Sequence, residues 1–118
     1  MSYSHTLAPD EIRELLRIAR ATLREWVDSE RIPPGKPHRA ALVAPAAVVV
    51  GLTRAGVEVS GVSDRELPLY RAIQEALVAA AEQWADDLDD EATESIAIAI
   101  TVTTAAGPHR FCEPPRAT

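Results

Sequence analysis

Apolar residues near the start of the chain recur at the three- and four-residue spacing of an α-helix. At about 100° per residue they fall on one stripe. Pro9 suits a first helical turn, where its missing N–H leaves no bond unmade, and Asp10 and Glu11 suit the positive end of the helix dipole. The spacing predicts a helix over about 9–30, which must end before the proline-rich stretch that follows. Its buried stripe comprises Ile12, Leu15, Leu16, Ala19, Leu23, Trp26 and Val27.

Two short β-branched runs follow that stretch. Residues 47–53 and 57–62 have the composition of strands, and residues 54–56 between them are typical of a three-residue hairpin loop. Gly56 supplies the left-handed position that such a loop requires. Gly61 lies inside the second run, where glycine indicates a bulge or the close approach of another backbone.

A second helical stripe and a third strand complete the pattern. Pro68 opens a helix over 69–86, whose buried stripe comprises Leu69, Ile73, Ala76, Leu77, Ala80 and Trp84. Over 95–104 large and small side chains alternate, so the large ones should face a helix layer. The large residues are Ile96, Ile98, Ile100 and Val102, and the small ones are Ala97, Ala99, Thr101 and Thr103.

The elements occur in the order α-β-β-α-β, which predicts an α+β fold. We expect a small, mostly antiparallel sheet with two helices packed on one face. The length of 118 residues fits a single domain over 1–118. Within it we expect an ordered core at about 9–104, a flexible N-terminus at 1–8 and a flexible, Pro-rich tail at 105–118.

The net charge and the cysteine content limit the classes of binding partner and the cellular compartment that we expect. The net charge of -6 argues against general nucleic-acid binding, which needs a basic surface. A single cysteine, Cys112, excludes an intrachain disulfide and fits a reducing compartment. The N-terminus lacks the pattern of a signal peptide, and no apolar run reaches the roughly 18 residues of a membrane span. These features predict a cytoplasmic protein without membrane contact.

Several stretches, in their order and spacing, resemble one known family. They are 15–23, Ile32-Pro33-Pro34 with 44–52, 56–61, 72–81 and 96–103. Together they resemble the AMME chromosomal region candidate protein family over about 12–104. The first looks like that family's first helix, and the last two look like its Ala-rich helix and the strand after it. Because the family's domain continues beyond that strand, the chain resembles the front half of an AMME-type domain.

The resemblance breaks at the family's signature, Arg-Gly-Cys-Ile-Gly. Gly61 matches its first glycine, but Ser60 stands in place of the arginine and Val62 in place of the cysteine. Valine cannot act as a thiolate nucleophile or a metal ligand. Chemistry that the family performs through that cysteine is therefore absent here, and we expect no catalytic residue, no metal and no cofactor.

The first helix carries the most prominent candidate binding surface. Arg13, Arg17, Arg20 and Arg24 are spaced by 4, 3 and 4 residues, which puts them on one strip beside the apolar stripe. Such a strip can bind an acidic segment of a protein or, as a less favoured alternative, phosphates of a nucleic acid. The structural alternative is a solvated helix face with local pairs such as Glu14 with Arg17.

The end of the hairpin offers a second candidate site. A small-molecule pocket or a small enzyme site there would use Ser60, Gly61, Ser63 and Asp64. No His or Lys is placed by the sequence to activate either serine, so the alternative is that both are structural.

His109 and Cys112 are three residues apart, but a zinc site needs more ligands than these two. We expect neither a metal site nor any other role for Cys112. The acidic run 86–91 lacks the ligand spacing of a calcium loop and is typical of a solvated segment.

These observations favour a non-catalytic protein-interaction or accessory module over an enzyme or a nucleic-acid binder. We also expect a homodimer or a complex with a protein partner. The strand at 95–104 carries no charge and no proline to protect a free edge, and its second face is small and neutral. The alternative is a monomer in which the tail 105–118 folds back as a fourth strand.

Overall fold

The computed structural model describes residues 7–33, 46–63, 67–87, 93–104 and 107–113. Several features of the sequence lie outside these ranges, namely residues 1–6, His38, Asp64, residues 88–92 of the acidic segment and residues 114–118. The described elements are α1 (Pro9–Ser29), β1 (Ala47–Arg54), β2 (Val57–Ser63), α2 (Leu69–Ala81), the 3₁₀ helix η2 (Glu82–Asp87), β3 (Ala97–Thr104) and β4 (Gly107–Cys112).

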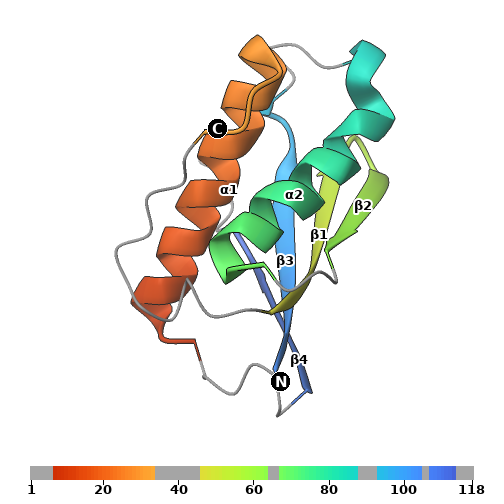
Figure 1. Cartoon of the computed structure of the whole chain (residues 1–118). Coiled ribbons are helices and arrows are strands. Elements are labelled where there is room, and N and C mark those ends of the chain that lie inside the picture. Colours follow the sequence, from red (N-terminus) through yellow and green to blue (C-terminus); the bar gives the residue numbers. More distant parts are fainter. Residues whose placement is uncertain (1–6, 34–45, 64–66, 88–92, 105–106, 114–118) are drawn as a thin grey trace.

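The four strands form one sheet in the order β2-β1-β3-β4, and every neighbouring pair is antiparallel. Helix α2 packs on β1 and β2, while α1 packs on α2 and β3. Figure 1 shows both helices over the same face of the sheet. The predicted α+β fold, the antiparallel sheet and the one-sided helix layer are confirmed. In the described part of the chain, no helix has the length and apolar character that a membrane span requires.

Strand β4 corrects two expectations, namely a sheet of three strands and a flexible tail over all of 105–118. Residues 107–112 pair with the outer side of β3, where Phe111 lies opposite Ile100 and packs against the core. The prediction failed because Gly107 and Pro108 are typical of a turn, and one large apolar residue makes no strand pattern. Proline is tolerated on β4 because an outer strand does not need every N–H group.

Alternation along the strands places the core between the sheet and the helices. Ile98, Ile100 and Val102 of β3 are at most 1% exposed, as the large-residue face predicts. The neighbouring β1 contributes Val48, Val50 and Leu52 to the same layer. Helix α1 adds Leu15, Leu16, Ile18, Ala19 and Leu23, and α2 adds Leu69, Ala72, Ile73, Ala76, Leu77, Ala80 and Ala81.

Both helices begin as predicted, but the second differs at its end. Pro9 stands in the first turn of α1, and the Glu11 carboxylate accepts a hydrogen bond of 2.7 Å from the Ala8 N–H. Helix α2 ends at Ala81 and continues only as the 3₁₀ helix η2, in which Trp84 has non-helical dihedrals. The predicted α-helix over 69–86 is therefore five residues too long.

The hairpin loop is shorter than predicted. Arg54 pairs with Val57, which leaves Ala55 and Gly56 as a two-residue loop. Both have positive φ angles, 52° and 81°, as the tight turns of two-residue hairpins require. Gly56 is left-handed as predicted, whereas Ala55 adopts this conformation at a steric cost.

Candidate functional site

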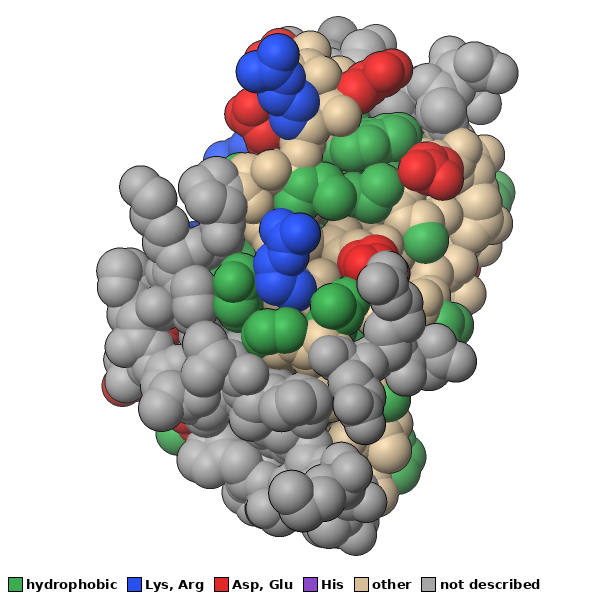
Figure 2. Space-filling model, in the orientation of Figure 1, with side chains coloured by type: hydrophobic (Ala, Val, Ile, Leu, Met, Phe, Trp, Pro, Cys, Tyr) green, Lys and Arg blue, Asp and Glu red, His purple; other side chains and the backbone are tan. Residues whose placement is uncertain are grey.

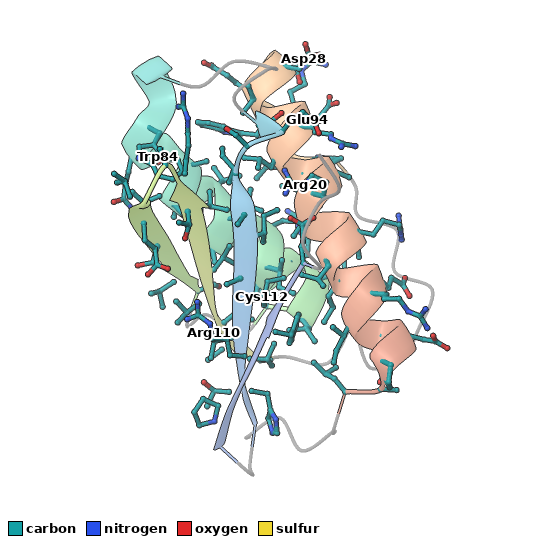
Figure 3. All side chains as sticks on the ribbon, turned by 180° about the vertical axis from the view of Figure 1, so that it is seen from behind. Arg20, Asp28, Trp84, Glu94, Arg110 and Cys112 are labelled. Carbon is teal, nitrogen blue, oxygen red and sulfur yellow. The ribbon has the colours of Figure 1, made fainter. Side chains whose placement is uncertain are left out.

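The four arginines of α1 do not form one exposed strip. Arg13, Arg17 and Arg24 have side chains that are 75%, 58% and 51% exposed, but the Arg20 side chain is only 8% exposed. Arg20 turns inward toward the start of β3 and the end of β4 (Figure 3). The expectation of a four-arginine surface is therefore wrong for Arg20.

Arg20 connects three separate segments through its guanidinium group. Its Nε donates a hydrogen bond of 3.0 Å to Glu113 Oε2, and Nη2 pairs with the other oxygen of the same carboxylate. Nη1 and Nη2 also donate hydrogen bonds of 2.7 Å to the carbonyl oxygens of Thr93 and Ile96. These bonds use most of the five guanidinium donors, so Arg20 holds α1 against the residues that flank β3 and β4.

The other three arginines border a groove beside α1 and have acidic neighbours. Arg13 pairs with Asp10, and Arg24 meets Glu94 at 3.2 Å. Arg17 lies 3.8 Å from Glu14, which is too long for a hydrogen bond. The groove has a volume of about 320 Å³ and is lined by Arg13, Leu16, Arg17, Arg20, Ala21, Arg24 and Glu113.

The hairpin residues that were candidates for a pocket do not converge. Ser60 is exposed, Ser63 is 2% exposed, and their odd separation along β2 puts them on opposite faces of the sheet. The Ser63 hydroxyl is buried without a hydrogen-bond partner. This geometry does not support the alternative of an enzyme or small-molecule site built from both serines.

Gly61 has a packing role that the sequence predicted. A Cβ atom at this position would lie 1.9 Å from the Ala76 carbonyl oxygen and 2.7 Å from the Ala80 nitrogen. The backbone of α2 therefore rests directly on β2, which is the close approach that a glycine within a strand indicates.

His109 and Cys112 also lie on opposite faces, because β4 alternates between them. Figure 3 shows Cys112 and Arg110 on β4, on the side of the sheet away from the helices. Among the described residues, no group of three or more His, Cys, Asp or Glu side chains is placed to hold a metal ion.

The side of the sheet opposite the helices, which we call the open face, carries small and neutral side chains. Val49 is 38% exposed and its cross-strand neighbour Val62 is 61% exposed. The charged residues of the open face are Glu58 on β2 and Arg110 on β4, the two outer strands. Its other residues are Ala47, Gly51, Thr53, Ser60, Ala97, Ala99, Thr101, Thr103, Pro108 and Cys112.

By contrast, the helix side is mixed in character. Figure 2 shows this side, where single basic and acidic side chains stand between apolar ones.

Two features of these surfaces, the buried Arg20–Glu113 pair and the exposed valines, were not predicted from the sequence. Arg20 and Glu113 are 93 residues apart, and Glu113 belongs to a stretch that the sequence assigned to a flexible tail. Only the place of Arg20 at the border of the apolar stripe, next to Ala19, could have indicated that it is buried. The exposure of the open-face valines has no signal in the sequence, because the first two strands lack the alternation of the third.

Comparison with known proteins gives a fold but no function. No protein-family model matches the chain, and no curated protein is found as a relative. An uncharacterized protein from Pyrococcus horikoshii has a similar structure, with a TM-score of 0.61 and 23% sequence identity. The match covers 75% of this chain and 48% of the Pyrococcus protein, so the shared fold spans about half of that protein.

Proposed function

We propose that this chain is a non-catalytic protein-interaction module of the AMME type, and that the open face of its sheet binds a second copy of the same chain. The exposed pair Val49 and Val62, on a face that neither α1 nor α2 covers, carries this proposal. A cytoplasmic location remains our expectation from the sequence.

The side chains of the open face suit contact with another sheet. Alanine, glycine and threonine have short side chains that project little from the sheet. A second sheet can therefore approach to the roughly 10 Å that face-to-face packing requires. Burial of Val49 and Val62 removes apolar surface from water at about 25 cal/mol per Å². Neither central strand places a charge on this face, so no ion there would lose its hydration.

Strand β4 covers the edge of β3, so this edge is not open to a second copy. Pro108, His109 and Arg110 also give β4 the proline and polar side chains that protect a free edge. The alternative in which the tail supplies a fourth strand is thus what the structure contains. The case for a dimer rests on the open face instead.

The neutral centre and charged rim of the open face suit a second copy as the occupant. The open face is acidic at β2, through Glu58, and basic at β4, through Arg110. A two-fold axis parallel to the strands lays β2 of each protomer over β4 of its partner. The neutral centres then meet each other. Glu58 and Arg110 lie four positions apart in register, roughly 13 Å along the strands, so they stay at the rim of the interface without pairing.

The open face is small for an interface. Four strands about 4.8 Å apart, each about seven residues long at ~3.3 Å per residue, make a face of roughly 450 Å². Two such faces bury roughly 900 Å², which lies at the low end for specific interfaces. We therefore expect a weak, reversible dimer.

Sedimentation velocity over micromolar to millimolar concentrations tests the proposal. The wild type should shift from monomer to dimer, and Val49→Lys should remain a monomer because it places a charge at the centre of the interface. Val57→Lys is the matched control, since Val57 is 56% exposed but occupies a β2 position whose neighbours Val59 and Gly61 face the helices. A wild type that stays monomeric throughout, or a Val49→Lys variant that dimerises as the wild type does, contradicts the proposal.

A further inference from the structure

A groove along α1 has a charge distribution that the dimer does not use. One part of it is the hollow lined by the arginines, and a neighbouring hollow of about 460 Å³ shares Ala21 and Arg24 with it and extends toward the C-terminal end of α1. The second hollow is lined otherwise by Glu25, Asp28, Thr93 and Glu94. The two hollows together form one groove that is basic at one end and acidic at the other.

At the basic end, the buried pair neutralises itself. The Glu113 carboxylate is bound by Arg20, so its charge is already matched. The exposed charged side chains that line this end are Arg13, Arg17 and Arg24, in a chain whose net charge is -6. Leu16 and Ala21 provide an apolar floor between them.

Arg17 is the guanidinium best placed to accept a ligand. Arg13 and Arg24 have closer acidic neighbours, whereas Arg17 lies 3.8 Å from Glu14, beyond hydrogen-bond distance. A carboxylate that reaches Arg17 can form the two parallel hydrogen bonds of a fork-shaped pair without displacing a closer contact.

The acidic end determines the class of ligand. Asp28 and Glu94 lie at the edge where α1 meets the start of β3, on the same side as Arg20 (Figure 3). A nucleic-acid strand carries a uniform negative charge, so it would be repelled where it continued past Arg24. A peptide can carry carboxylates at one end and a basic side chain at the other.

We propose that this groove binds a segment of a partner protein that has acidic residues at one end, a small apolar residue in the middle and Lys or Arg at the other end. The carboxylates bind Arg17 and Arg13, the apolar residue lies on Leu16 and Ala21, and the basic residue binds Asp28. This surface belongs to α1 and is separate from the open face, so dimerisation and peptide binding are independent.

Fluorescence anisotropy with a labelled synthetic peptide tests the proposal. The probe has three Glu residues, a central Ala-Leu-Ala and three Lys residues, and it should bind the wild type with a salt-sensitive affinity. Arg17→Glu should weaken binding by about tenfold or more, as expected for one lost charge-assisted pair. Asp28→Lys should weaken it in the same way from the other end. Arg71→Glu is the control, because Arg71 is an exposed arginine on α2 outside the groove, and it should bind as the wild type does.

Two comparison ligands complete the test. An all-Glu peptide and an oligothymidylate of similar length should both bind more weakly than the mixed peptide, because they meet the acidic end. Tighter binding of the oligothymidylate would assign the groove to nucleic acid and overturn the proposal. The proposal also fails if the mixed peptide does not bind the wild type, or if Arg17→Glu and Arg71→Glu bind it equally. Thermal melting of each variant confirms that it is folded.

Discussion

The two faces of the sheet are built from the same strands but differ in the size and burial of their side chains. On the helix side, Val50, Leu52 and Ile100 are fully buried, and the α2 backbone touches Gly61. On the open face, the intervening residues are small or polar, and Val49 and Val62 remain exposed. Adjacent residues of β1 can therefore have opposite roles.

This difference separates stability from recognition. The helix side determines whether the chain folds, because close packing there leaves no space for additional atoms. The open face can change its side chains at little cost in stability, so its composition is available to serve binding.

The largest difference between the two faces is expected when a methyl group is added to a glycine on each of them. Gly61→Ala puts a Cβ atom within 1.9 Å of a helix carbonyl oxygen, so α2 must move away from β2. We expect a loss of about 4 kcal/mol, beyond the usual cost of overpacking. The control is Gly51→Ala on the open face, where the nearest atom is Glu58 Oε2 at 3.7 Å. Urea denaturation that gave the two variants equal stability would refute the close-packing account.

Replacement of the buried Arg20 should lower the free energy of unfolding nearly as much as Gly61→Ala does. Arg20→Met keeps the length of the side chain but removes the Arg20 donors from the Glu113 carboxylate and the Ile96 carbonyl, while the Thr93 carbonyl keeps its 3.3 Å bond from the Ile96 N–H. The expected loss is about 3 kcal/mol, at the low end for a broken buried pair. Arg24→Met removes an exposed pair and should change the free energy of unfolding by less than about 0.5 kcal/mol. Chemical denaturation of both variants distinguishes the two pairs, and a similar loss in each would contradict the structural role of Arg20.

Two neighbouring valines of β1 provide a matched pair. Val50→Thr buries a hydroxyl among apolar side chains at a site that is 0% exposed, which should cost about 2 kcal/mol. Val49→Thr places the same group on the open face and should be close to neutral when measured on the monomer at low concentration. Thermal unfolding at that concentration compares them, and a reversed order would mean that the open face is buried in the monomer.

The smallest expected effect lies in the hairpin loop, outside both faces. Ala55 has a φ angle of 52°, which asparagine tolerates better than alanine. Ala55→Asn should therefore stabilise the chain by about 0.5 kcal/mol. Urea denaturation measures the gain, and a clear loss of stability would argue against the two-residue loop.

The parts of the fold that the sequence predicted are those with a local pattern. The stripe of α1 and the alternation around Ile98 and Ile100 each occupy one segment, so periodicity was sufficient to predict them. The role of Gly61 was also predictable, because a glycine within a strand indicates either a bulge or the close approach of another backbone. The Arg20–Glu113 pair joins residues 93 positions apart, which no local pattern contains. Strand β4 pairs with the adjacent β3, but a Gly-Pro start and one large apolar residue make no strand pattern.

The candidate sites were predicted less well than the fold for a related reason. Helical spacing correctly put four arginines on one side of α1, but it could not show that residues beyond β4 would cover Arg20. Strand alternation alone would have separated Ser60 from Ser63, since an odd separation places two side chains on opposite faces.

The central claim is that the open face binds a second copy, and the single cysteine offers a direct test in the unmodified protein. Cys112 is exposed and lies on the open face, beside Ala99. Its alkylation by iodoacetamide should slow as the protein concentration rises through the range in which the mass doubles from 12.7 kDa. In Val49→Lys the rate should stay constant at every concentration. An alkylation rate that is the same for dimer and monomer would contradict an interface on this face.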